Sequence, residues 1–182
     1  MHSTQKLLLF HHLSVIAGLF YYGFNIQYAL IILFGCIVWA YVVGHRGLHM
    51  YMAHTKYKDC IKSYLYTFGA LITGVGSPLT FAATHRQHHA YHDTEKDPHS
   101  PEHIGWYNVW LMNYNSQYIS PRLVKDFLKS DFQKFMNRHW IQITIVMLVV
   151  LFLIDPRLVC FVVSPFSAVS YTHLTLPTKD GV

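Results

Sequence analysis

The fold class is decided by residues 7–43, which read LLLFHHLSVIAGLFYYGFNIQYALIILFGCIVWAYVV. Residues 7–24 are interrupted by only three polar positions, and a run of about 18 apolar residues can cross the hydrocarbon core of a bilayer as a helix. Asn25 and Gln27 mark a short polar turn, after which residues 28–44 are again apolar. The pattern predicts a hairpin of two membrane-spanning helices.

Two further apolar runs follow. Residues 140–163 predict a third span. Residues 60–75 are also apolar, but they end at a break that contains Ser77 followed by Pro78. A serine hydroxyl followed by proline is a favourable helix start, so residues 60–75 are expected to lie along the membrane interface without crossing it.

Composition and charge agree with a membrane protein. Hydrophobic residues make up 52% of the chain and charged residues 13%, whereas a soluble domain carries about 25% charged residues. Eleven of the 14 Lys and Arg residues lie between residues 46 and 138, and positively charged loops stay in the cytoplasm. We therefore predict an all-α, multi-pass integral membrane helical bundle with a cytoplasmic helical cap at residues 45–138. This topology explains the basic charge, so no nucleic-acid partner is predicted.

Histidine is concentrated in the predicted cap, where nine of the 14 histidines lie between residues 45 and 103. If the helix that starts at Pro78 continues, His85, His88, His89 and His92 fall within about 100° of one helical face. A row of neutral imidazoles suits iron, copper or zinc.

The first histidine group comprises His45, His49 and His54, directly after the second span. His49 and His54 would be about 140° apart on a regular helix. Either the helix unwinds between them, or the two side chains enter a cavity from different sides. Both groups together exceed the roughly four ligands of one zinc ion, and the E-x-x-H pattern of soluble di-iron bundles does not accompany them.

Order and spacing of these motifs resemble the membrane fatty acid desaturase family, of the acyl-CoA desaturase type. Residues 49–54 resemble its first histidine box, H-x-x-x-x-H. Residues 85–89 resemble the second box, H-x-x-H-H, which is followed by D-P-H at residues 97–99. Residues 103–106 resemble the H-x-G-W that comes next.

The resemblance implies two iron ions held by histidine, with O2 as co-substrate. Two hydrogens would leave adjacent methylenes of a long acyl-CoA or acyl-lipid chain, giving a cis double bond while oxygen leaves as water. The electron donor would be a cytochrome-type haem protein, or a ferredoxin with its reductase. The implied iron ligands are His49, His54, His85, His88 and His89. A second tier of candidate site residues comprises His45, His92, His99, His103, Asp97 and Trp106.

The sequence also departs from the family. Thr84 stands where an acidic residue usually precedes the second box, and a third H-x-x-H-H box does not occur. Residues 1–166 are therefore expected to be part of a desaturase domain, and residues 167–182 a tail of foreign sequence. Five ligands are too few for two irons, so this chain alone is expected to be inactive.

Three alternatives to a desaturase stay open. A related membrane di-iron hydroxylase of fatty acids, sterols or alkanes would use residues 45–49 as H-x-x-x-H. A membrane haem cytochrome would need histidines inside its spans, where only His11 and His12 lie. The third alternative is a non-catalytic remnant that binds metal.

Overall fold

The structure is a computed structural model, and it describes residues 3–92, 94–110 and 119–164. These residues form helices and connecting segments without a β-strand, which confirms the all-α prediction. The predicted foreign tail at residues 167–182 lies outside the described residues. The helices are α1 (Ser3–Tyr22), α2 (Ile26–Cys36), η1 (Ile37–Ala53), α3 (Ile61–Thr73), α4 (Pro78–Ala90), α5 (Pro101–Ile104), α6 (Trp106–Trp110), η3 (Pro121–Val124), α7 (Lys125–Leu128), α8 (Asp131–Ile154) and η4 (Leu158–Val163).

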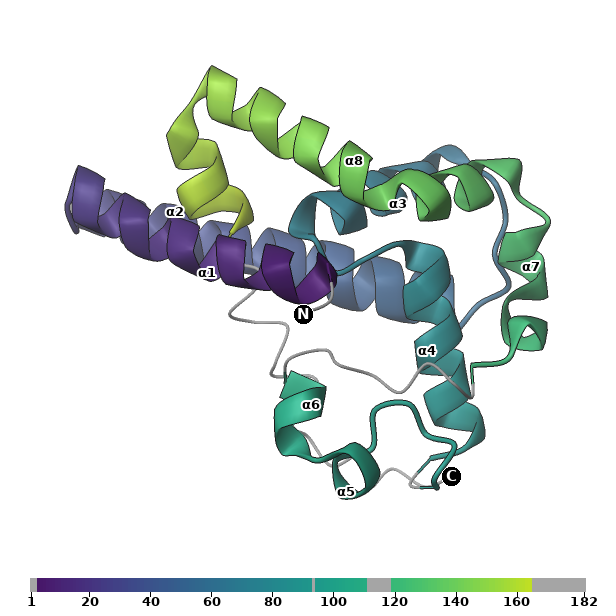
Figure 1. The fold of residues 1–182 in the computed structure, drawn as a ribbon. Coiled ribbons are helices and arrows are strands. Elements are labelled where there is room, and N and C mark those ends of the chain that lie inside the picture. The colour runs from purple at the N-terminus through teal and green to yellow at the C-terminus, as the bar shows by residue number, and fades with distance from the viewer. Residues whose placement is uncertain (1–2, 93, 111–118, 165–182) are drawn as a thin grey trace.

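The predicted hairpin is present. Figure 1 shows the chain running out along α1 and returning along α2 and η1, which join into one helix. At the reversal Gly23 has a positive φ of 77°, a conformation that glycine adopts without steric cost. Asn25 then caps α2, because its side chain accepts a hydrogen bond of 3.0 Å from the backbone N–H of Tyr28.

By length and composition, two helices of the described chain can cross a membrane, Ile26–Ala53 and Asp131–Ile154. The number rises to three if α3 and α4 together form one bent span. Helix α1 covers most of the predicted span at residues 7–24, but it does not meet the same criterion. Its lower hydropathy comes from polar residues, including Lys6 and the neighbouring pair His11 and His12.

The predicted third span at residues 140–163 falls on two separate helices, α8 and η4. Helix α8 begins earlier, at Asp131, where the Ser130 side chain accepts a hydrogen bond from a backbone N–H. It ends at Ile154, and η4 then packs against α1 and α2 without continuing α8 (Figure 1). The chain reverses at Asp155 and Pro156, because proline has no N–H for the helical ladder.

Replacing Gly35 by valine is expected to loosen the packing of η4 against α2. A Cβ atom at this position would lie 2.5 Å from the backbone oxygen of Val162, and a backbone atom cannot turn aside. Overpacking costs about 1–3 kcal/mol, so the melting temperature in detergent should fall by about 2–4 °C per kcal/mol. Leu33→Val changes an exposed side chain of the same helix and serves as the control. Equal melting of the two variants would contradict this packing.

The break between α3 and α4 follows the predicted signals. Helix α3 ends at Gly74, which has a φ of 73°. Helix α4 begins at Pro78, and the Ser77 side chain accepts a hydrogen bond of 3.2 Å from the backbone N–H of Thr80. The two helices meet at 91°, so α4 turns away from α3 and runs beside the end of η1.

The core of the cap lies where η1, α3, α4 and α7 meet. Leu48 and Met52 of η1, Ala70 of α3, Ala82 of α4 and Phe127 of α7 are all buried in it. Helix η1 runs through residue 45 without interruption, so the predicted boundary between span and cap is not a structural break. His49 of the first histidine box therefore lies on the helical continuation of the second predicted span, and His54 follows directly after the end of that helix.

Candidate metal centre

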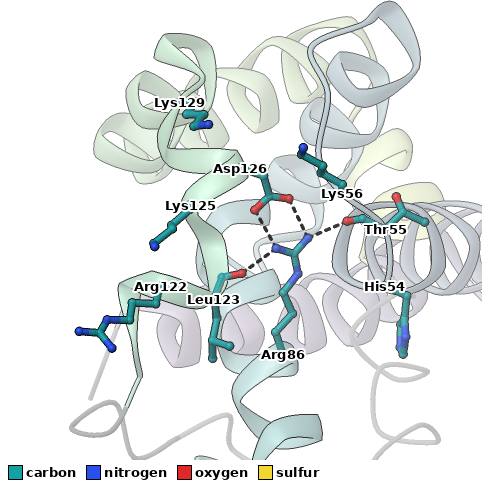
Figure 2. A pocket seen from close by; sticks show the side chains of 9 residues that line it. All are labelled: His54, Thr55, Lys56, Arg86, Arg122, Leu123, Lys125, Asp126 and Lys129. Carbon is teal, nitrogen blue, oxygen red and sulfur yellow. Dashed lines mark hydrogen bonds and ion pairs between the residues drawn. The ribbon is translucent and has the colours of Figure 1, made fainter.

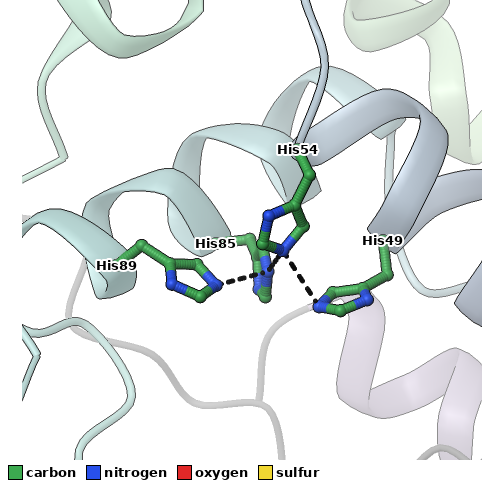
Figure 3. A group of neighbouring side chains, drawn as sticks. All are labelled: His49, His54, His85 and His89. Atoms are coloured by element: carbon green, nitrogen blue, oxygen red, sulfur yellow. Dashed lines mark hydrogen bonds between the residues drawn. The ribbon is translucent and has the colours of Figure 1, made fainter. Parts of the chain in front are cut away.

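Four histidines from the two boxes meet at one point (Figure 3). One ligand nitrogen each from His49, His54, His85 and His89 lies within 4.8 Å of the others. The Nε2 atom of His54 is 3.2 Å from that of His49 and 3.0 Å from that of His85. The Nε2 atom of His89 is also 3.0 Å from that of His85. We call these four residues the histidine cluster.

The first box reaches the cluster because η1 is a π-helix. The backbone N–H of His54 donates to the carbonyl oxygen of His49 at 3.1 Å, five residues earlier. On an α-helix these side chains would diverge by about 140°, but the wider turn that an i→i+5 bond closes puts them on the same side. The sequence left open whether the helix unwinds between His49 and His54 or the two side chains enter a cavity from different sides. The structure shows neither, because the π-helical i→i+5 hydrogen bond brings both side chains to the same side.

The second box reaches the cluster through α4. His85 and His89 are four residues apart, so they share one face of the helix. The prediction that His92 extends this face is wrong, because α4 ends at Ala90. Tyr91 has a φ of −137° and a ψ of 30°, which leaves the helical path and places His92 in the turn that follows.

His88 belongs to a separate group, formed with His92 and Asp97. Asp97 is only 1% exposed, and one of its carboxylate oxygens is 2.8 Å from Nδ1 of His88. The other oxygen accepts the backbone N–H of His99. Burial would raise the pKa of Asp97, but the hydrogen bonds from His88 and from this N–H hold it below its usual value. Because an ionised carboxylate only accepts, Nδ1 of His88 donates the hydrogen bond to Asp97, which leaves Nε2 as the ring nitrogen that could bind a metal.

Removing the Asp97 carboxylate is expected to weaken metal binding. Loss of a group that orients a histidine ligand typically costs about 10–100-fold in metal affinity, and Asp97→Ala should fall in this range in a titration with Co(II). Glu102→Ala removes an exposed carboxylate of α5 and should bind like the wild type. The titration must resolve two Co(II) ions, since only the ion that His88 would bind should respond. An unchanged affinity for both ions would contradict the role of Asp97 in orienting His88 for a metal.

The remaining candidates lie outside the histidine cluster. The ring of His45 stacks on that of His49 at a centroid distance of 5.4 Å. The ring of His99 stacks on that of His88 at 4.1 Å. His103 and Trp106 are exposed on α5 and at the start of α6, and neither belongs to the two groups that could hold a metal.

The histidine cluster fits a metal ion. Each contact between two Nε2 atoms accommodates one proton at most, so neutral rings cannot all satisfy one another. Burial, followed by the charge of His49, lowers the pKa of His85 to about 2. Burial is also the main cause that lowers the pKa of His54 and His89. The rings of His54, His85 and His89 therefore favour the neutral form, which is the form that binds metals. A divalent cation would satisfy all four nitrogens of the histidine cluster at once.

One ion pair beside the histidine cluster was not predicted from the sequence. Arg86 lies inside the second box, and Asp126 pairs with it from 40 residues away along the chain. Both line a pocket of about 410 Å³ that also includes His54 (Figure 2). The sequence offers one indication that Arg86 has a role at this site, namely its position between the predicted ligands His85 and His88.

Together, the apolar helices and the convergent histidine boxes indicate a membrane protein with a cluster of histidines that could hold a metal ion. The chain belongs to the fatty acid desaturase family, since the model of that family matches residues 16–176. The matched segment includes the start of the predicted foreign tail, whose origin stays a prediction.

Curated relatives agree with the family. The chain is 32% identical over 108 residues to "Delta-9 acyl-lipid desaturase 2" of Arabidopsis thaliana, in an alignment that covers 54% of this chain and 35% of that protein. It is 30% identical over 103 residues to "Acyl-CoA C20 Delta5-desaturase" of Anemone leveillei, covering 53% of this chain and 32% of the relative. It is 28% identical over 104 residues to "sn-1 stearoyl-lipid 9-desaturase" of Anabaena variabilis, covering 54% and 38%. Alignments thus span about a third of the length of these relatives. No solved structure matches the chain.

Proposed function

We propose that the chain is the part of a desaturase that carries the first two histidine boxes. The complete protein would introduce a cis double bond into a long fatty acyl chain, bound as acyl-CoA or acyl-lipid. The observation that carries the proposal is the convergence of four Nε2 atoms from both boxes in a chain that belongs to the fatty acid desaturase family.

The proposed metal is a pair of iron ions. The histidine cluster would hold one iron, and Nε2 of His88, with its ring oriented by Asp97, would contribute to the second. Iron bound there would supply the redox chemistry for the reduction of O2. The proposed reaction balances when O2, two electrons and two protons, together with two hydrogens from adjacent methylenes, give a double bond and two waters. The electrons would come from a cytochrome-type haem protein or from a ferredoxin with its reductase.

The proposed topology is multi-pass, with both histidine groups on the cytoplasmic side. Support comes from the concentration of Lys and Arg between residues 46 and 138. Single cysteines introduced at Lys56 and Thr94, in a background without native cysteines, should both be labelled by an impermeant reagent from the cytoplasmic side only. Labelling of the two positions from opposite sides would contradict this topology.

The proposed activity is tested with the complete gene product that contains this chain. Expressed in a host that lacks its own desaturase, it should produce unsaturated fatty acids that mass spectrometry of the lipids detects. His85→Ala should abolish the product. Hydroxylated chains in place of unsaturated ones would favour the related hydroxylase. Absence of any modified chain, in spite of iron incorporation, would favour a metal-binding remnant.

A further inference from the structure

The guanidinium of Arg86 donates hydrogen bonds to backbone carbonyl groups on both sides of His54. Its Nε atom donates to the carbonyl oxygen of Ala53 at 2.7 Å. Its Nη2 atom donates to the carbonyl oxygen of Thr55, also at 2.7 Å (Figure 2). A longer bond of 3.1 Å reaches the carbonyl oxygen of Met52. The two short bonds therefore hold the carbonyl groups of the residues on either side of His54.

Asp126 completes this arrangement from α7. Its carboxylate receives two parallel bonds from Arg86, of 2.8 and 3.0 Å. It also accepts the backbone N–H of Tyr57 at 2.6 Å. The exposed fraction of the side chain is 18% for Arg86 and 11% for Asp126. Two-point pairing between a guanidinium and a carboxylate fixes orientation as well as distance, so the segment from Met52 to Tyr57 is tied to both α4 and α7.

His54 needs such support more than the other members of the histidine cluster. His49, His85 and His89 lie inside helices, whereas η1 ends at Ala53 and no regular element follows before Ile61. The last carbonyl groups of a helix have no partner within the helix, and Arg86 supplies partners at this end. Because Arg86 neighbours His85 on α4, the same side chain links the backbone of His54 to the second box.

We propose that Arg86 and Asp126 are positioning residues, which hold the backbone of His54 in register with His85 and His89 so that the two boxes form one metal site. The inference rests on the proposed metal role of the histidine cluster. It predicts that substitutions of Arg86 or Asp126 lower the metal affinity through their effect on His54.

The first test measures Co(II) affinity of the full chain in detergent, with Co(II) alone as the probe. Arg86→Lys keeps the charge but loses the planar fork, and it should bind Co(II) about tenfold more weakly or worse. Asp126→Asn should behave similarly. The matched controls are Arg157→Lys and Asp155→Asn. These two residues also form an ion pair, with 2.6 Å between Nη2 of Arg157 and a carboxylate oxygen of Asp155, and neither belongs to the histidine cluster. Equal losses in controls and test variants would overturn the proposal.

The second test asks whether the effect passes through His54. In a His54→Ala background, Arg86→Lys should change Co(II) affinity by less than about twofold, because non-additivity reports coupling between the two residues. In a His89→Ala background its full effect should persist. A merely structural role of Arg86 would give the same loss in both backgrounds, and this outcome would overturn the inference.

The third test does not depend on metal. Hydrogen exchange of the amides in residues 54–57 should be at least about tenfold faster in Arg86→Lys than in the wild type, while exchange in α8 stays unchanged. If the wild type bound no Co(II), the proposed metal role would fail. Faster exchange confined to residues 54–57 would still support the positioning of His54, and unchanged exchange would overturn it.

Discussion

His85→Ala is expected to abolish metal binding by the chain. His85 is the member of the histidine cluster that α4 holds deepest: its Nε2 lies 3.0 Å from those of both His54 and His89, and its ring centroid is 4.5 Å from that of His49. Removing it takes away one nitrogen and the packing that brings the others together. Because loss of an orienting partner alone costs about 10–100-fold in affinity, loss of this ligand should exceed about 100-fold.

The measurement is the Co(II) or Fe(II) affinity of purified protein, together with its thermal unfolding without metal. The metal-free variant should still unfold in one cooperative transition, so that a lower metal affinity reports the lost ligand and not a lost fold. His103→Ala, on the exposed surface of α5, is the control and should bind metal normally. Retained affinity in His85→Ala would contradict a metal site built on the second box.

Acid is expected to destabilise the metal-free cap. Burial is the largest cause that lowers the pKa of His85 from 6.5 to about 2 and that of His99 from 6.5 to about 4. The unfolded chain titrates both residues near 6.5. Between this value and the folded pKa the unfolded state binds more protons, so stability is present above pH 6.5 and is lost as the pH falls. For His99 alone the loss by pH 4 is on the order of 3 kcal/mol.

The check is urea unfolding of chelator-treated protein in detergent between pH 7 and pH 4. The midpoint should fall steadily with pH, and His99→Gln should fall less because one titrating group is gone. His103→Gln keeps both buried histidines and should follow the wild type. A midpoint that stays constant or rises on acidification would contradict the neutral, buried state of these imidazoles.

Local signals predicted most of the helices. The apolar run before residue 44 predicted the hairpin, and the dipeptide Ser77-Pro78 predicted where α4 starts. These features depend on neighbouring residues, so a sequence can report them. The end of α4 at Tyr91 was missed because neither glycine nor proline marks it. The separation of η4 from α8 was missed because the apolar pattern resumes after Pro156.

The candidate site was predictable in its residues and not in its geometry. The four members of the histidine cluster were all named from the two boxes, but the π-helical register that joins His49 to His54 leaves no mark in hydrophobic periodicity. The pairing of Arg86 with Asp126 depends on a contact between distant parts of the chain. Only the folded structure brings these groups together.

X-ray absorption of the iron-loaded, purified chain tests the central claim most directly. The account predicts a first shell of nitrogen and oxygen with the multiple scattering of several imidazole rings, and its loss in His85→Ala. The claim that the two boxes form one metal centre would be contradicted by iron bound without imidazole scattering, or by a spectrum that His85→Ala leaves unchanged.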